Sequence, residues 1–174
     1  MRLAAALALV ALTSGCMDPS KDAKIPGEPL GTFHVVGKLQ HSSCGPGAVG
    51  STDVWEFDMQ LSRDGPDLYW LNGQEPIWGK VASDGVSFSF DTATQVTLRE
   101  PKGAMPGCAI VRRDVASGTL DHPENIGGFE GLMRFGYAQT PDSDCLELVS
   151  VDGGFATLPC EISYRVSATK TKDP

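Results

Sequence analysis

The sequence predicts an all-β domain, built as an antiparallel up-and-down barrel or as a β-sandwich of about eight to ten short strands. Apolar side chains recur at every second position in many short segments between residues 31 and 170, the period of a half-buried strand. Turn residues separate these segments, in a chain with 20 glycines and 12 prolines. No window in this region shows the spacing of an amphipathic helix. Strands joined in sequence order would favour the barrel.

The first two strands have the clearest alternation. In the segment that begins at Gly31, the side chains of Phe33, Val35 and Leu39 fall on one face. The segment Asp53–Leu61 contains the longest uninterrupted alternation in the chain, so we expect its odd-numbered side chains to face the core. Those side chains are Trp55, Phe57, Met59 and Leu61.

Four short apolar segments, each bounded by turn residues, continue the predicted sheet: Asp67–Leu71, Ile77–Val81, Val86–Phe90 and Thr94–Arg99. The turn Ser83–Gly85 between the second and third segments is a hairpin signal. Within the fourth segment, Val96 and Leu98 are expected to face inward. Trp70 and Trp78 lie close to turns, and we expect them at the rim of the domain.

The C-terminal half continues with further strand segments: Cys108–Arg112, Val115–Leu120, Phe129–Tyr137, Cys145–Val151, Gly154–Leu158 and Cys160–Ala168. The first two form one strand with an interruption at Arg113 and Asp114, which is consistent with a β-bulge. The basic pair Arg112 and Arg113 is interpreted as part of a solvated strand edge.

The N-terminal segment Met1–Cys16 has the layout of a secretion signal. Arg2 precedes an apolar run from Leu3 to Leu12, and small residues lead from this run to Cys16. The run is shorter than the roughly 20 residues that a membrane-spanning helix needs. The segment resembles the bacterial lipoprotein signal, in which the cysteine is lipidated and becomes the mature N-terminus. An ordinary cleaved signal is the alternative.

The resemblance implies a signal peptide at residues 1–15, a lipid anchor and flexible linker at 16–30, and a single β-domain at 31–170. Prolines and glycines keep the linker irregular. The sequence departs from the lipoprotein pattern at Thr13, where leucine is usual. Met17, rather than aspartate, follows the cysteine, which implies the outer membrane in a bacterium that has two membranes. We therefore expect a lipid-anchored protein of the cell envelope.

The charge of the chain narrows the choice of partners. The formal net charge is −8, and removing the single positive charge of Arg2 with the signal would leave −9. Such an acidic chain argues against binding to nucleic acid and against electrostatic binding to anionic lipids. The partners that remain are the membrane through the N-terminal lipid, an apolar small molecule, a glycan or another envelope protein.

The cysteines predict disulfide bonds. Lipidation of Cys16 would leave four others: Cys44, Cys108, Cys145 and Cys160. An even number in an exported protein is typical of disulfides, and the lack of a C-x-x-C pair argues against a zinc site. Four cysteines allow three sets of pairs. Because Cys145 and Cys160 flank one hairpin-like unit, we favour that pair, with Cys44 bonded to Cys108.

Two polar loops carry residue types from which a site could be built. The loop Asp121–Glu124 combines two carboxylates with His122, as a metal site or an acid–base pair would. Asp142, Asp144 and Asp152 could bind calcium, but the spacing of a calcium loop is absent. Both loops are interpreted as solvated surface. Because no catalytic or phosphate-binding motif occurs, we expect no catalytic residue, metal or cofactor, and a hydrolase or metal enzyme would need a site assembled by the fold.

Aromatic side chains in the alternating rows are the remaining candidates for ligand binding: Trp55, Phe57, Phe88, Phe90, Phe135 and Tyr137. They either fill the core, which we favour, or line a barrel that holds one small apolar ligand. Gly31–Phe33 and Arg165 resemble positions in the first and last strands of lipocalin-like proteins, which implies a barrel and a carrier function. An exposed Trp70 and Trp78 would instead suit a glycan-binding module. The preferred hypothesis is a non-enzymatic binding or structural domain.

Overall fold

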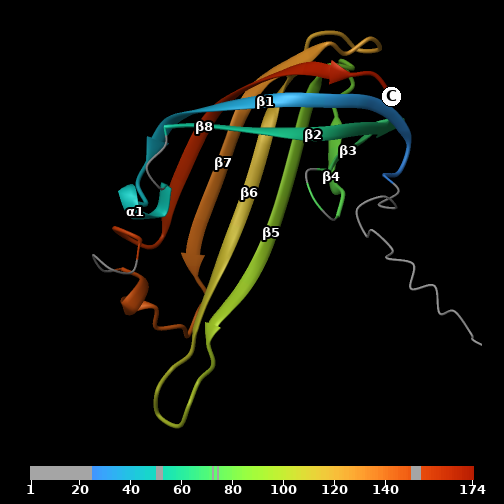
Figure 1. The fold of residues 1–174 in the computed structure, drawn as a ribbon. Helices are drawn as coiled ribbons and strands as arrows, with labels where there is room; N and C mark the ends of the chain where they lie inside the picture. The colour runs from blue at the N-terminus through green and yellow to red at the C-terminus, as the bar shows by residue number, and fades with distance from the viewer. Residues whose placement is uncertain (1–24, 50–52, 72, 74, 150–153) are drawn as a thin grey trace, which may run out of the picture.

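The computed structural model describes residues 25–49, 53–71, 73, 75–149 and 154–174. They form a closed antiparallel barrel whose strands β1 to β8 are neighbours in sequence order (Figure 1). This confirms the all-β prediction and selects the up-and-down barrel over the sandwich. The strands are β1 (Glu28–Ser42), β2 (Val54–Asp64), β3 (Asp67–Leu71), β4 (Ile77–Val81), β5 (Ser87–Arg99), β6 (Cys108–Leu120), β7 (Gly128–Gln139) and β8 (Cys160–Lys172). A short helix, α1 (Pro46–Val49), and the 3₁₀ turn η1 (Leu146–Leu148) lie in connections.

The barrel closes where the first strand meets the last. Strand β1 pairs with β2 along one edge and with β8 along the other, so that Gly37 lies opposite both Trp55 and Val166. Burial alternates along β1, and its odd-numbered residues from Gly31 to Gly37 face the interior. Phe33 and Val35 are fully buried there.

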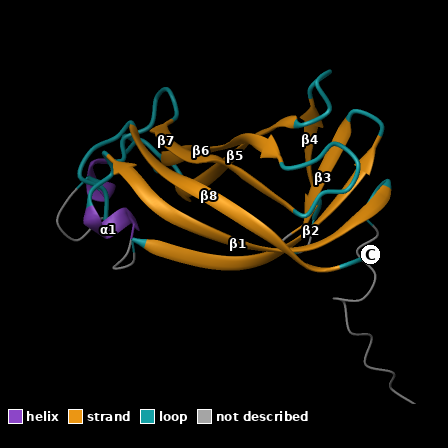
Figure 2. Cartoon of the chain, turned by 90° about the horizontal axis from the view of Figure 1, so that it is seen from above, coloured by secondary structure: helices purple, strands orange, loops and turns teal. Residues whose placement is uncertain are grey.

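The wall of the barrel is uneven in height. Strands β3 and β4 have five residues each, whereas β5 and β6 have 13. Strand β3 pairs with β2 only from Gln60 onward, and β4 pairs with β5 only as far as Phe90. Beyond these points β2 and β5 diverge, and β5, β6 and β7 continue past the short strands (Figure 1). Strands β3 and β4 lie at one end of the barrel and α1 lies at the other (Figure 2); we call these the closed end and the open end.

Large apolar side chains fill the closed end. The fully buried ones include Phe33, Met59, Leu61, Leu68, Leu120 and Ile126. Gly118 of β6 pairs with Gly131 of β7, and a β-carbon on Gly118 would lie 2.8 Å from the ring of Phe88 and 2.2 Å from the carbonyl oxygen of Glu130. Glycine at this position therefore makes room for the aromatic ring. The void that remains in this region is about 10 Å³, space for at most one water molecule.

Strands β5 and β6 differ from the sequence-based expectation. The segments Val86–Phe90 and Thr94–Arg99 belong to one strand, and Val96 and Leu98 are 42% and 49% exposed rather than buried. Both side chains lie on the same face of β5 as the inward-facing Phe90. The neighbouring strand β4 has only five residues and does not reach far enough to cover them. Strand β6 runs through Arg113 and Asp114 without a change of register, so the predicted bulge is wrong.

The structure also differs from the prediction at two strand boundaries and at one predicted hairpin. Strand β1 begins at Glu28 and β8 ends at Lys172, slightly outside the expected limits. The predicted strand Cys145–Val151 is a 3₁₀ turn at Leu146–Leu148, and the segment Gly154–Leu158 contains no strand. Residues 150–153, within the hairpin-like unit expected between Cys145 and Cys160, lie outside the described residues, as does Cys16.

All four predicted cysteines form disulfides, but the favoured pairing is wrong. The bonds join Cys44 to Cys160 and Cys108 to Cys145. Because β1 and β8 are neighbours in the closed barrel, the chain that leaves β1 lies beside the start of β8. The amide of Ser43 accordingly donates to the carbonyl oxygen of Glu161 at 2.9 Å.

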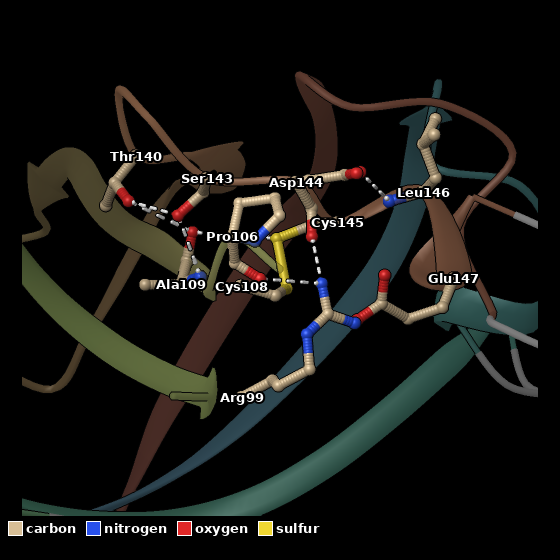
Figure 3. The surroundings of a disulfide bond; sticks show 10 residues. All are labelled: Arg99, Pro106, Cys108, Ala109, Thr140, Ser143, Asp144, Cys145, Leu146 and Glu147. Atoms are coloured by element: carbon tan, nitrogen blue, oxygen red, sulfur yellow. Dashed lines mark hydrogen bonds and ion pairs between the residues drawn. A yellow bond between two sulfur atoms is a disulfide. The ribbon is translucent and has the colours of Figure 1, made fainter. Parts of the chain in front are cut away.

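The second disulfide ties the segment that follows β7 to the first residue of β6 (Figure 3). Arg99 donates to the carbonyl oxygens of Asp144, at 2.7 Å, and of Pro106, at 3.3 Å, and it pairs with the carboxylate of Glu147. The hydroxyl of Ser143 accepts the amide of Ala109 at 3.0 Å. These bonds hold the segment after β7 against the hairpin that forms one side of the open end.

Candidate functional site

A cavity of about 350 Å³ occupies the open half of the barrel. Its walls come from strands β2 to β8, and Ala48 of α1 lies at its edge. Phe155 packs on Tyr137 with ring centroids 5.3 Å apart. The apolar and aromatic lining residues include Trp55, Trp70, Ile77, Phe90, Ala116, Met133, Phe135, Tyr137, Ile162 and Tyr164.

A stack of aromatic rings forms one wall of the cavity. Trp55 stacks on Phe57 with centroids 4.5 Å apart, and Phe57 stacks on Trp70 at 5.7 Å. Tyr164 meets the edge of Trp55 at 5.5 Å. A β-carbon on Gly37 would lie only 2.8 Å from the indole nitrogen of Trp55, so the glycine on β1 allows this ring to lie against the strand. The wall is therefore held in position by ring-to-ring packing.

Trp70 lies in the interior, contrary to the expectation that it sits at the rim. It is only 5% exposed, and its indole nitrogen has no hydrogen-bond partner among the described residues. Leu68 and Trp70 share the inward face of β3, and the ring of Trp70 meets that of Phe90 edge-on at 5.6 Å. Trp78 is 51% exposed and donates to Asp67 at 3.0 Å. The pair of exposed tryptophans invoked for glycan binding is therefore not formed.

One ion pair lies on the wall of the cavity. The Nε of Arg112 donates to Oδ1 of Asp114 at 2.7 Å, and the guanidinium carbon lies 5.1 Å from the centre of the Phe135 ring. Residues 112 and 114 share the face of β6 that also carries Ala116, so both side chains reach the cavity. Burial acts to lower the pKa of Arg112, but the hydrogen bond and the charge of Asp114 outweigh it and raise that pKa.

Arg112 keeps 46% of its side-chain surface exposed, as expected of a solvated residue, but it lies within a closed barrel rather than at an edge and also borders the cavity. Its neighbour Arg113 points to the opposite side of β6, where its Nε donates to Asp91 on β5 at 2.8 Å. The two adjacent arginines thus have different environments because side chains alternate along a strand.

Two tyrosines add hydroxyl groups to the cavity wall. Burial raises the pKa of Tyr137; the charge of Arg112 opposes this shift and that of Asp114 adds to it. Burial also raises the pKa of Tyr164, with smaller contributions from Tyr137 and Asp53. Both hydroxyls therefore stay protonated near neutral pH and can donate hydrogen bonds.

The six predicted ligand-binding residues separate into three groups. Four of them line the cavity: Trp55, Phe90, Phe135 and Tyr137. Phe57 lies between two indole rings and supports the wall, whereas Phe88 packs in the filled end. The favoured interpretation of core filling thus describes one end of the barrel and not the other.

The lining residues that sequence reasoning missed include the polar or aromatic residues Trp70, Arg112, Asp114 and Tyr164. The sequence did indicate the direction of Arg112 and Asp114. They have the same parity as the inward-facing Ala116 and Leu120, so without a bulge they point to the same side of the strand. Tyr164 shares a face with Ile162 and Val166. What the period could not indicate was that this stretch of the inward face borders a cavity.

The polar loops considered as sites have structural contacts. The Nδ1 of His122 accepts the amides of Glu124 and Asn125, at 3.2 Å and 3.0 Å, and Asp121 accepts the amide of Gly127 at 3.0 Å. These bonds hold the β6–β7 turn.

Asp144 likewise accepts the amide of Leu146 at 3.2 Å, and Asp152 lies outside the described residues. In the part of the chain that the structure describes, no three His, Cys, Asp or Glu side chains gather as metal ligands.

Two further observations complete the description of the chain. No helix within the described ranges is long and apolar enough to cross a bilayer. Comparison of the chain with protein-family models, with curated proteins and with solved structures found no match.

Proposed function

We propose that this chain is a lipoprotein of the cell envelope, anchored through Cys16, whose barrel binds a small and largely apolar molecule. The contrast between the two ends of the barrel carries the proposal. The interior of one end leaves a void of about 10 Å³, whereas the other leaves about 350 Å³ between side chains that are mostly apolar or aromatic. Small-molecule sites commonly have volumes of about 300–1,000 Å³ and mostly apolar walls.

Binding without catalysis accounts best for the lining residues. The cavity wall formed by the described residues includes no serine, cysteine or histidine that could act as a nucleophile or general base. The carboxylate of Asp114 is already engaged by the guanidinium of Arg112. The wall is thus suited to contact and orient a molecule.

The end of the barrel at which the described chain enters β1 supports a cavity that faces away from the membrane. Strand β1 begins at Glu28, near the turn that joins β2 to β3, and a β-carbon on Gly27 would touch the backbone of Arg63. This is the closed end of the barrel (Figure 1). A lipid on Cys16 would therefore hold the closed end towards the bilayer and leave the open end to the aqueous side.

Binding of a neutral aromatic dye tests the cavity. N-phenyl-1-naphthylamine should bind the purified domain at a saturable site with a micromolar dissociation constant, measured by the rise in dye fluorescence. Trp55→Ala should weaken this binding about tenfold, because the dye would lose about 1.4 kcal/mol of ring contact. Trp78→Ala removes an exposed indole outside the cavity and should leave the affinity unchanged. Absence of saturable binding, or equal losses in both variants, would contradict the proposal.

Fractionation tests the anchor. Cys16→Ser prevents lipid attachment, so the domain should move from the membrane fraction to the soluble fraction of the envelope. Mass spectrometry of the wild-type protein should find a lipid-modified peptide that begins at Cys16. If the variant stays with the membranes and no lipid is detected, the protein is not held there by a lipid on this cysteine.

A further inference from the structure

The cavity has an apolar floor and a polar stretch of wall nearer its open end. Along β6, the inward residues Ala116, Asp114 and Arg112 follow one another towards the open end. The register aligns them with Met133, Phe135 and Tyr137 of β7, in that order. The wall therefore changes from aliphatic to charged and hydroxylic over two positions of each strand.

The guanidinium of Arg112 is oriented but only partly used. Asp114 occupies its Nε, while the two terminal nitrogens have no hydrogen-bond partner among the described residues. The ion pair on one side and the ring of Phe135 on the other hold the group in a defined orientation. The side chain of Arg112 keeps 46% of its surface exposed, so the terminal nitrogens can be reached from the cavity.

We propose that the molecule bound in the cavity is an amphiphile with an anionic head, a carboxylate or a sulfonate, that bonds to the terminal nitrogens of Arg112. This inference rests on the proposed binding function and adds the chemical class of the ligand. The apolar body of the ligand lies on the floor formed by Phe90, Ala116 and Met133. Two oxygen atoms of a carboxylate or a sulfonate can accept from the two parallel donors of a guanidinium, and such charge-assisted bonds are stronger than neutral ones.

A cationic ligand fits the same wall less well. The position above the face of Phe135, where a ligand cation would be attracted, is already occupied by Arg112. The negative charge of Asp114 is paired with the same guanidinium. The donors left over come from the terminal nitrogens of Arg112 and from the protonated hydroxyls of Tyr137 and Tyr164, and this excess of donors favours an acceptor group.

Two dyes with the same aromatic skeleton test the inference. 1-Anilinonaphthalene-8-sulfonate carries an anionic head, and N-phenyl-1-naphthylamine lacks it. Arg112→Met keeps an unbranched apolar stem that reaches about as far as the Nε of arginine, but it removes the guanidinium with its donors and charge. We expect it to weaken binding of the sulfonate dye at least about tenfold and to change the affinity for the neutral dye less than about twofold.

Matched variants make the test specific. Arg113→Met removes the same group from the outer face of β6, where it contacts Asp91, and should leave both affinities unchanged. Arg112→Lys keeps the charge but not the two parallel donors, so it should weaken binding of the sulfonate dye by an intermediate factor. If Arg112→Met has a lower melting temperature than the wild-type protein, Arg112→Lys is used for the comparison of the two dyes instead.

The outcomes separate the two proposals. If both dyes bind the wild-type protein and the substitutions of Arg112 change their affinities equally, the anionic head group is wrong and the apolar cavity stands. If neither dye binds the wild-type protein at a saturable site, the proposed function fails and the head-group inference fails with it. A larger loss for the sulfonate dye in Arg113→Met than in Arg112→Met would assign anion binding to the outer surface instead.

Discussion

Replacing Cys44 and Cys160 together by alanine is expected to lower the free energy of unfolding by about 5 kcal/mol. The bond closes a loop with a sequence separation of 116 residues, and in the chain-entropy model such a cross-link removes much of the freedom of the unfolded chain. It also ties the chain that leaves β1 to the start of β8, where the barrel closes. Urea unfolding followed by tryptophan fluorescence measures the change.

The second disulfide provides the control for this measurement. Its sequence separation is 37, so replacing Cys108 and Cys145 together should cost about 4 kcal/mol, somewhat less than the first pair. Peptide mapping of the oxidised protein should find the same two pairs. A peptide that joins Cys145 to Cys160 would contradict the structure, and equal or reversed losses would show that loop length does not determine the effect.

Phe33→Ala is expected to cost about 3–5 kcal/mol, the range for removing a buried aromatic side chain. Phe33 is fully buried in the closed end and packs against Phe129, with ring centroids 6.1 Å apart. Its removal would leave a cavity in the part of the barrel that has almost no free volume. Thermal and urea unfolding of the variant measure the loss.

Two comparisons make this second result informative. Asp58→Ala changes an exposed side chain on the outer face of β2 and should change stability by less than about 0.5 kcal/mol. Trp55→Ala should cost less than Phe33→Ala, because Trp55 is only partly buried and already borders a cavity. If Trp55→Ala proved the more damaging, the open half would be packed more tightly than its geometry indicates. If Asp58→Ala cost more stability than Phe33→Ala, the register of β2 would be wrong by one residue.

Local patterns predicted much of the fold because side-chain direction in a strand depends on position parity alone. The row Trp55, Phe57, Met59 and Leu61 faces inward as its alternation predicts. The same rule placed Phe33 and Val35 in the core. At Arg113 we assumed a β-bulge, which breaks the alternation of inward and outward residues along β6. That prediction is wrong, because β6 continues through Arg113 in one register and the uninterrupted alternation was correct.

Three properties can be predicted from the amino-acid sequence alone: the all-β class, the inward faces of the long strands and the participation of four cysteines in disulfides. These properties follow from the period of apolar residues, from the turn residues and from the number of cysteines. The pairing of the cysteines depended on which strands become neighbours when the barrel closes, since that brings residues far apart in the chain side by side.

The cavity also depended on the tertiary structure. Strands β3 and β4 are short, so the same inward period that fills one end of the barrel leaves the other end open. Val96 and Leu98 are exposed for this reason, and Arg112 can lie on a cavity wall. A periodic pattern specifies which face a side chain occupies, but the height of the neighbouring strands decides whether that face meets protein or empty space.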